Sequence, residues 1–315
     1  MTDKYAKPIN DIDRYAVVGN PISHSKSPLI HRAFAKQTGQ DISYEAVLAP
    51  LDGFAATIQD LVNQGFKGAN VTVPFKFEAF NLCDELTERA KSAGAANTLT
   101  FESGKIKGDN TDGVGLVNDI KINLKHVLQP QDRRGLPQFA KPLKWQAKCE
   151  GSSPQNIPAK AGYSCLKDAQ ILLLGAGGAA QGVLFPLLNA HPKSIIIANR
   201  TLAKAQQMAE KAGVAAKVSA NTFESLQGKF DVIINATSTG LSDSKLPISD
   251  AIFAKNCLAY DMMYGRETAF MQQAKANGAQ VADGLGMLVE QAAEAFFLWR
   301  GVHPQTAPVI KMLRS

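Results

Sequence analysis

The feature that most constrains the fold of this chain is a glycine-rich turn between two apolar runs in its second half. The run Ile171–Leu174 ends directly at a glycine, which is typical of a buried parallel strand, and a second apolar run follows at 194–198. The turn fits the pattern G-x-G-x-x-G/A, in which Ala180 keeps the following helix close to the strand. The glycines of the pattern permit a tight turn and let the backbone approach a pyrophosphate. The residues predicted to hold the dinucleotide here are Gly175, Ala176, Gly177, Gly178 and Ala179.

The end of the second apolar run indicates which dinucleotide is bound. Sites for NAD usually carry Asp or Glu there, where the carboxylate bonds the ribose 2′-hydroxyl. This chain instead reads Asn199-Arg200-Thr201, with Lys204 close behind. A carboxylate would repel a 2′-phosphate, whereas a guanidinium grips it through two hydrogen bonds. We therefore predict NADP(H) as the cofactor; the alternative is a glycine-rich turn beside an unrelated surface arginine.

Length and composition set the class of protein. The 315 residues are enough for two domains, and 45% hydrophobic with 20% charged residues is ordinary for a soluble globular protein. No apolar run approaches the length of a membrane span, and the N-terminus has no apolar signal core. The four cysteines are scattered without the paired spacing of a zinc site, so free thiols in a cytoplasmic protein without a metal are expected.

The net charge of +6 is unevenly distributed. Residues 126–165 contain six Lys or Arg against two acidic residues, and five of the 15 prolines. This segment is predicted to be a flexible insertion, either a tolerated surface insertion, which we favour, or a basic arm that touches anionic partners. The remainder of the chain is close to neutral, which argues against a nucleic-acid-binding protein.

The first third of the chain alternates strand and helix patterns. Residues 1–13 are predicted to be a polar tail; strands are predicted at 15–18, 42–48 and 68–73, and helices from Ser27, at 51–62 and at 76–93. Ser27 is expected to cap its helix, with Pro28 in the first position. This alternation implies an α/β sheet of its own, followed by a hairpin over 95–107 and a helix that opens near Asp112.

Polar residues gather at the ends of these predicted elements. Asn70 and Thr72 face the same side of a strand, and Lys76 lies just beyond its C-terminal end, where open α/β sheets place ligands. Ser23 and Ser25 stand in a hydroxyl-rich loop. From local sequence alone, the loop serines favour turn and capping roles, a lone lysine favours solvated surface, and Asp112 favours a helix N-cap.

The second half of the chain repeats the apolar-strand pattern. Helix-compatible segments separate most of the predicted strands, which is the arrangement of a doubly wound sheet. The strands are predicted at 171–174, 194–198, 214–218, 231–235, 257–260 and 279–282.

Taken together, the motifs resemble the shikimate dehydrogenase family in residue type and in order along the chain. The resemblance covers everything except the N-terminal tail and 126–165. The motifs that carry it are Ser23-x-Ser25, Asn70-Val71-Thr72-Val73-Pro74-Phe75-Lys76, Ala96-Asn97-Thr98, Asn110-Thr111-Asp112-Gly113, the glycine loop, Asn199-Arg200-Thr201, Asn235-Ala236-Thr237-Ser238 and Gly284-Leu285-Gly286-Met287-Leu288.

The resemblance implies the NADP-dependent, reversible reduction of 3-dehydroshikimate to shikimate in aromatic amino-acid biosynthesis. It implies that Lys76 and Asp112 form the acid–base pair. The small-molecule substrate would be bound by Ser23, Ser25, Asn70, Thr72, Asn97, Asp112, Tyr264 and Gln291. The cofactor would be bound by the glycine loop, Asn199, Arg200, Thr201, Lys204, Thr237, Ser238, Met262, Gly284 and Glu88.

The expected architecture is an N-terminal α/β substrate domain and a Rossmann-like, doubly wound NADP-binding domain, with the active site in the cleft between them. Residues 1–112 and 284–315 are assigned to the substrate domain and 113–283 to the NADP domain. The chain is expected to be a monomer or homodimer. Two rivals remain: a quinate/shikimate dehydrogenase with broader substrate or NAD use, and a non-catalytic NADP-binding sensor. Two departures from the family are the length of 126–165 and Lys204, where many relatives carry Arg.

Overall fold

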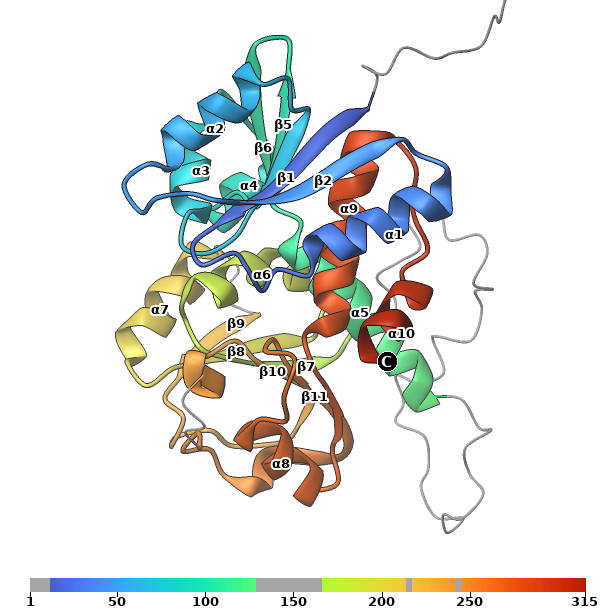
Figure 1. The fold of residues 1–315 in the computed structure, drawn as a ribbon. Helices are drawn as coiled ribbons and strands as arrows, with labels where there is room; N and C mark the ends of the chain where they lie inside the picture. Colours follow the sequence, from blue (N-terminus) through green and yellow to red (C-terminus); the bar gives the residue numbers. More distant parts are fainter. Residues whose placement is uncertain (1–11, 129–165, 214–216, 242–244) are drawn as a thin grey trace, which may run out of the picture. The chain divides into compact units, whose positions relative to one another are not determined.

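The computed structural model describes residues 12–128, 166–213, 217–241 and 245–315. The chain forms two compact units (Figure 1). Unit 1 contains Met1–Asp112 and Val289–Ser315, and unit 2 contains Gly113–Leu288. Residues 1–11 of the predicted polar tail and most of the predicted insertion at 126–165 lie outside the described residues, whereas Asp13, predicted to end the tail, is the first residue of strand β1.

Unit 1 is built on a mixed six-stranded sheet in the order β2-β1-β3-β5-β6-β4. Strand β1 pairs in parallel with β2 and β3, whereas β3, β5 and β6 pair antiparallel, so the predicted hairpin is present as β5–β6. Short β4 pairs in parallel with β6 at the edge. The strands are β1 (Asp13–Gly19), β2 (Ile42–Leu48), β3 (Gly68–Val71), β4 (Glu85–Leu86), β5 (Thr98–Glu102) and β6 (Lys105–Asp109).

Helices cover both faces of this sheet. One face packs on a core that includes Phe54 and Ile58 of α2, and the other carries aromatic rings, including Tyr15 stacked on Trp299 of α9 at 4.6 Å between centroids. Gly68 lets α9 come close, because a Cβ there would stand 2.7 Å from the Trp299 indole nitrogen. The helices are α1 (Ser27–Thr38), α2 (Phe54–Asn63), α3 (Lys76–Leu82), α4 (Glu88–Ala93), α9 (Leu285–Arg300) and α10 (Ala307–Arg314).

The single helix predicted over 76–93 is wrong. Helix α3 ends at Leu82 because Cys83 adopts extended backbone, and the next residues pair with β6 as β4. Helix α4 then starts afresh with Thr87 as a true N-cap, whose hydroxyl accepts a hydrogen bond from the Ala90 N–H. The apolar residues of this stretch have helical spacing, so the spacing gives no sign of the edge strand β4.

Unit 2 is built on six parallel strands in the order β12-β11-β10-β7-β8-β9. Successive strands run outward from β7 in both directions, so the predicted doubly wound sheet is confirmed. The strands are β7 (Gln170–Leu174), β8 (Ser194–Ala198), β9 (Val218–Asn221), β10 (Phe230–Asn235), β11 (Phe253–Asp261) and β12 (Gln280–Ala282). The predicted strand at 214–218 is displaced to β9, and 214–216 lie outside the described residues.

Alternate residues of these strands enter two separate cores. Ile171 and Leu173 pack on the side of α5, α6 and α7, whereas Leu172 and Leu174 face the opposite core with α8. The central strands β7, β8 and β10 are thus covered on both faces, which explains their nearly continuous apolar sequences. Figure 1 shows α7 and α8 on opposite sides of the strands. The helices are α5 (Asp112–Leu128), α6 (Gly178–Asn189), α7 (Leu202–Lys211) and α8 (Ala269–Ala276).

The C-terminal boundary of unit 2 falls at Leu288, whereas the predicted domains divided at 283–284. Close packing explains the difference. A Cβ on Gly284 would stand 2.2 Å from the Met262 carbonyl oxygen, and one on Gly286 would stand 2.0 Å from an Asp119 carboxylate oxygen. Met287 also packs on the core that α5, α6 and α7 share. The first turn of α9 therefore belongs to unit 2.

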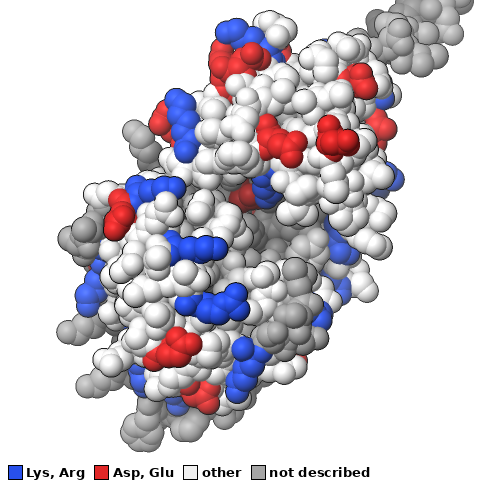
Figure 2. Space-filling view, turned by 90° about the vertical axis from the view of Figure 1, so that its left-hand side faces the viewer, with Lys and Arg blue, Asp and Glu red and all other residues white. Residues whose placement is uncertain are grey.

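Charges are mixed over the surface that Figure 2 displays, with lysine or arginine and acidic side chains interspersed. None of the helices in the described part of the chain is both long and apolar enough to cross a bilayer.

Candidate functional site

The centre of the site in unit 1 is an ion pair between Lys76 and Asp112. Lys76 opens α3 just after β3, and Asp112 opens α5 just after β6, so both stand at the same kind of position beyond a strand end. The ammonium Nζ donates to Asp112 Oδ2 at 2.6 Å, and both side chains are partly buried, with 32% and 18% exposed. The pair therefore keeps an oriented ammonium that still reaches solvent.

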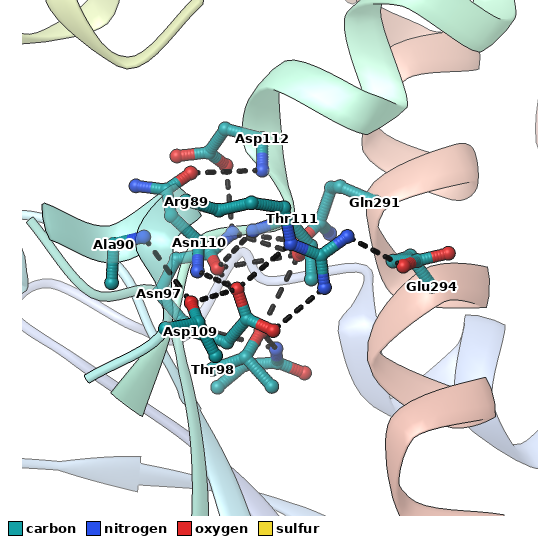
Figure 3. Close-up of polar contacts among 12 residues, drawn as sticks. Arg89, Ala90, Asn97, Thr98, Asp109, Asn110, Thr111, Asp112, Gln291 and Glu294 are labelled. Carbon is teal, nitrogen blue, oxygen red and sulfur yellow. Dashed lines mark hydrogen bonds and ion pairs between the residues drawn. The ribbon is translucent and has the colours of Figure 1, made fainter. Parts of the chain in front are cut away.

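Asn97 holds the other oxygen of this carboxylate (Figure 3). Its Nδ2 donates to Asp112 Oδ1 at 2.8 Å and lies 3.3 Å from Gln291 Oε1 on α9. Its Oδ1 accepts from the Thr111 backbone N–H at 2.8 Å, which fixes the orientation of the amide. Asn97 is 2% exposed, so these bonds are made away from water. The structure thus brings four predicted site residues, Lys76, Asn97, Asp112 and Gln291, into one network.

Asn70 joins this network from β3. Its Nδ2 donates to the Asn97 carbonyl and to Thr98 Oγ1, each at 3.1 Å, and its Oδ1 accepts from the Tyr44 hydroxyl at 2.7 Å. Burial raises the pKa of Tyr44 well above its ordinary value, so the phenol stays protonated as a donor.

The predicted carboxylate-binding serines occupy the loop between β1 and α1. Ser23 is exposed, and Ser25 Oγ accepts a hydrogen bond from the Ser27 backbone N–H at 3.3 Å. The predicted cap by Ser27 is wrong: α1 begins at Ser27 itself, and this side chain is 7% exposed. Thr72 lies in the turn after β3, where its methyl contacts the close-packed Gly19.

His31 is a buried residue that sequence reasoning missed. Its ring stacks on Tyr44 at 4.0 Å between centroids and 5° between planes, and it is fully buried. Burial lowers the pKa of His31 to about 3, so the imidazole is neutral at neutral pH. The signal was present, because His31 adjoins Ile30 and lies three residues before Phe34 on the apolar stripe of α1.

In unit 2, the glycine loop has the conformation that its sequence predicts. Gly175 has φ +108°, where a side chain would be strained, and a Cβ would stand 3.1 Å from the Ala236 carbonyl oxygen. A Cβ on Gly177 or Gly178 would meet nothing within 4 Å, so the backbone is open at the N-terminus of α6. No acidic residue lies in the first turn. Free N–H groups and the helix dipole make this position suitable for phosphate.

The predicted 2′-phosphate residues follow β8. Asn199 Nδ2 donates to the Thr201 carbonyl at 2.9 Å, which closes the turn into α7. Arg200, Thr201 and Lys204 are exposed. The two cations are therefore accessible to an anionic ligand.

The ends of β10 and β11 are tied together beyond the glycine loop. Asp261 is fully buried and accepts from Asn235 Nδ2 at 3.0 Å, from Thr268 Oγ1 at 2.6 Å and from the Met263 N–H at 2.9 Å. Asn235 in turn accepts from the Thr237 hydroxyl at 2.7 Å. The remaining predicted residues of unit 2 follow these and the next strand: Thr237 and Ser238 after β10, Met262 and Tyr264 after β11, and Gly284 after β12.

Burial raises the pKa of Tyr264, so this phenol remains a neutral hydrogen-bonding group. Glu88 is the predicted cofactor residue that the structure does not join to either network: its side chain is 87% exposed and pairs with Lys91 at 2.8 Å. Within the described ranges, no group of three or more His, Cys, Asp or Glu side chains has an arrangement that could hold a metal.

Three family descriptions match successive parts of the chain. The "Shikimate dehydrogenase substrate binding domain" matches residues 17–99, "Shikimate / quinate 5-dehydrogenase" matches 158–245, and the "Shikimate 5'-dehydrogenase C-terminal domain" matches 284–314. The chain is also 52% identical over 307 residues to a Shikimate dehydrogenase (NADP(+)) of Methylobacillus flagellatus, covering 96% of this chain and 100% of the relative.

The chain belongs to the shikimate dehydrogenase family. A second relative in this family, the Shikimate dehydrogenase (NADP(+)) of Herminiimonas arsenicoxydans, is 50% identical over 304 residues and is covered to 97%. Among solved structures, an Ael1 enzyme from Pseudomonas putida is 41% identical with a TM-score of 0.79, covering 96% of this chain and 98% of its own.

The shikimate 5-dehydrogenase of Thermus thermophilus, solved in complex with NADP(H) and shikimate, is 30% identical with a TM-score of 0.75. It covers 96% of this chain and 99% of its own length. The fold of this family, an α/β substrate domain beside a Rossmann-like domain, agrees with the two sheets described above.

Proposed function

We propose that this protein catalyses the NADP-dependent, reversible reduction of 3-dehydroshikimate to shikimate in aromatic amino-acid biosynthesis. The observation that carries the proposal is the 2.6 Å pair of Lys76 and Asp112, embedded in the Asn97–Gln291 network. Unit 1 (1–112 and 289–315) is assigned to the substrate and unit 2 (113–288) to NADP. A small-molecule substrate, a cytoplasmic location and a monomeric or homodimeric state complete the proposal.

Lys76 serves as the general acid in the direction of reduction. When bound, NADPH supplies a hydride to the carbonyl carbon, and negative charge develops on the carbonyl oxygen. The Lys76 ammonium stabilises that charge and transfers its proton to the oxygen, which yields the alcohol and a neutral amine. Asp112 orients the ammonium, and Asn97 fixes the carboxylate in turn. In the direction of oxidation, the neutral amine accepts the hydroxyl proton.

Polar side chains of unit 1 supply the substrate contacts in this proposal. Asn70, Thr72, Asn97 and Gln291 offer amides and a hydroxyl that suit ring hydroxyls, with Tyr264 of unit 2 as a further donor. Ser23 and Ser25 bind the substrate carboxylate through their hydroxyls. A site built to bond a hydroxyl discriminates strongly against analogues that lack it, because buried polar groups are then left unpaired.

The residues of unit 2 fit the dinucleotide. The open backbone at Gly177 accommodates a pyrophosphate, and the exposed Arg200 and Lys204 suit a 2′-phosphate. Thr237, Ser238, Met262 and Gly284 are assigned to the nicotinamide side. Glu88 remains a proposed cofactor contact that rests on the resemblance alone.

A quinate/shikimate dehydrogenase is the second candidate, favoured by the "Shikimate / quinate 5-dehydrogenase" description of residues 158–245. Two features of the chain speak against it. Arg200 takes the place of the acidic residue that an NAD site requires, and both loop positions are serines, whereas a bulkier threonine is sometimes found in quinate users.

Steady-state assays with shikimate and quinate, each with NADP and with NAD, test the proposal. Turnover of shikimate with NADP is expected to exceed the other three combinations. Preference for quinate with NAD would replace the proposal by the second candidate. Binding of NADPH by fluorescence without oxidation of either acid would identify the protein as a non-catalytic sensor.

A further inference from the structure

Arg89 joins two elements that carry proposed site residues, although it is itself outside the proposed site. It lies near the start of α4 and bridges the end of β6 and the middle of α9 (Figure 3). The bridge reaches Asp109, three residues before Asp112, and Glu294, three residues after Gln291. Residues three apart on a helix share a face, so Glu294 and Gln291 are neighbours on α9.

The contacts of Arg89 are short and directional. Its Nε and Nη2 donate to the two carboxylate oxygens of Asp109 at 3.0 and 2.6 Å, and its Nη1 donates to Glu294 Oε1 at 2.6 Å. Burial by itself lowers the pKa of Arg89, but the hydrogen bonds and charges of Asp109 and then Glu294 raise it above its ordinary value. The guanidinium therefore stays charged and binds both carboxylate oxygens of Asp109 with two N–H groups, a geometry that a lysine ammonium does not offer.

Asp109 is fixed independently of Arg89. It is 6% exposed, and its Oδ1 also accepts from the Thr87 hydroxyl at 2.7 Å and the Asn110 N–H at 2.6 Å. The turn continues rigidly to the ion pair, because Asn110 Oδ1 accepts from the Asp112 N–H at 3.1 Å. One end of the bridge is thus anchored to the same turn that positions Asp112.

The contacts between that turn and Gln291 are longer than the contacts that Arg89 makes. Gln291 Oε1 lies 3.3 Å from Asn97 Nδ2 and 3.4 Å from Thr111 Oγ1, both near the limit of a hydrogen bond. The Arg89–Glu294 bond at 2.6 Å is charge-assisted and one helical turn away. The stronger contact therefore contributes more than these two to holding this part of α9 against the turn.

We propose that Arg89 is a positioning residue that sets Gln291 against Asp112 through Glu294, and so tunes recognition of the substrate ring. This inference rests on the proposed function. Arg89 does not touch the reacting groups, and its loss changes the placement of Gln291 more than the acid–base step. Removal of Arg89 should raise the KM for shikimate with a smaller change in kcat, and should leave the KM for NADP unaltered.

A double-mutant cycle between Arg89 and Gln291 tests this pathway. Arg89→Ala and Gln291→Ala are each expected to raise the KM for shikimate about tenfold, the effect of one lost hydrogen bond of about 1.4 kcal/mol. If Arg89 acts through Gln291, the double variant should be no worse than Gln291→Ala alone. Arg89→Lys should fall between wild type and Arg89→Ala. Arg14→Ala, which removes an exposed ion pair with Glu45, is the matched control and should leave both KM values unchanged.

Additive effects in the cycle would overturn the proposal, as would a loss of active protein with both KM values unchanged, which is the mark of a purely structural role. If Arg89→Ala does not fold, the same cycle can be measured with Glu294→Ala and Gln291→Ala. Glu294→Ala removes only the contact between Arg89 and α9, and leaves the two hydrogen bonds from Arg89 to Asp109 in place. A wild-type enzyme without shikimate turnover would refute the proposed function instead, so the two failures are distinguishable.

Discussion

The proposed site residues of unit 1 and those of unit 2 are held in different ways. In unit 1, buried side chains hold one another through hydrogen bonds, as the chain from Tyr44 through Asn70 and Asn97 to Asp112 shows. In unit 2, the glycine loop offers open backbone, and Arg200 and Lys204 are exposed. We therefore expect the chemistry proposed for unit 1 to depend on side-chain functional groups, and the binding proposed for unit 2 to depend more on the open backbone. Substitutions should separate these two kinds of dependence.

The largest effect is expected from Lys76→Met, which removes the ammonium and keeps most of the side-chain volume. Loss of a positioned general acid should lower kcat by about 10²–10⁴-fold. NADPH affinity, measured by fluorescence titration, should not change, because the substitution leaves unit 2 untouched. Lys36→Met on the exposed face of α1 is the control. Retained turnover in Lys76→Met would remove Lys76 from the acid–base role.

Gly177→Ala tests the backbone-dependent binding proposed for unit 2. The added methyl meets no protein atom within 4 Å, so the folded state should tolerate it, yet it stands where a pyrophosphate would approach. The KM for NADP should rise about 10- to 100-fold through lost backbone hydrogen bonds to phosphate. Gly182→Ala, five residues further along the same helix, also has open space and should leave this KM unchanged. An equal change in the KM for NADP in Gly177→Ala and Gly182→Ala would contradict the proposed placement of the phosphates.

The buried His31 of unit 1 should make the free energy of unfolding decrease in acid. The pKa of His31 is about 3 in the folded state, below its ordinary 6.5, so between these values the unfolded chain binds the extra proton. The free energy of unfolding should therefore fall as the pH drops below 6.5, with His31 accounting for about 2 kcal/mol between pH 7 and 5. Urea denaturation at several pH values measures this slope.

His31→Phe keeps a ring against Tyr44 and should abolish the histidine-dependent part of that slope. His303→Phe is the control, because His303 is exposed and its replacement should leave the slope in place. An unchanged slope in His31→Phe would show that other groups cause the acid sensitivity.

The smallest effect is expected from Arg200→Ala, since this cation is exposed and Lys204 remains. The KM for NADP should rise about tenfold through loss of a charged hydrogen bond, while the KM for NAD, which lacks the 2′-phosphate, should stay the same. Raising the ionic strength should reduce the difference between wild type and variant. A parallel rise in both KM values would place Arg200 away from the 2′-phosphate.

The sequence predicted the centre of the unit 2 sheet well because β7, β8 and β10 are buried on both faces and read as apolar runs, whereas the more exposed edge strand β9 was displaced from its predicted position. It predicted the pair of Lys76 and Asp112 from the family motifs, whereas local sequence alone favoured a solvated lysine and a helix N-cap. It failed at 76–93, where the residues have helical spacing but a two-residue strand pairs with β6. It also missed Arg89 and His31, since their significance lies in contacts with residues distant in sequence, such as Glu294 and Tyr44.

Unit 1 is assembled from both ends of the chain, and α9 brings Gln291, Trp299 and Arg300 to strands that are encoded at the other end. In the order of synthesis, all of unit 2 comes before most of α9. The first strands of unit 1 therefore lack the cover of α9 until the residues after Leu288 have been made. A chain that stops before these residues should keep the sheet of unit 2 and lack most of α9 and all of α10.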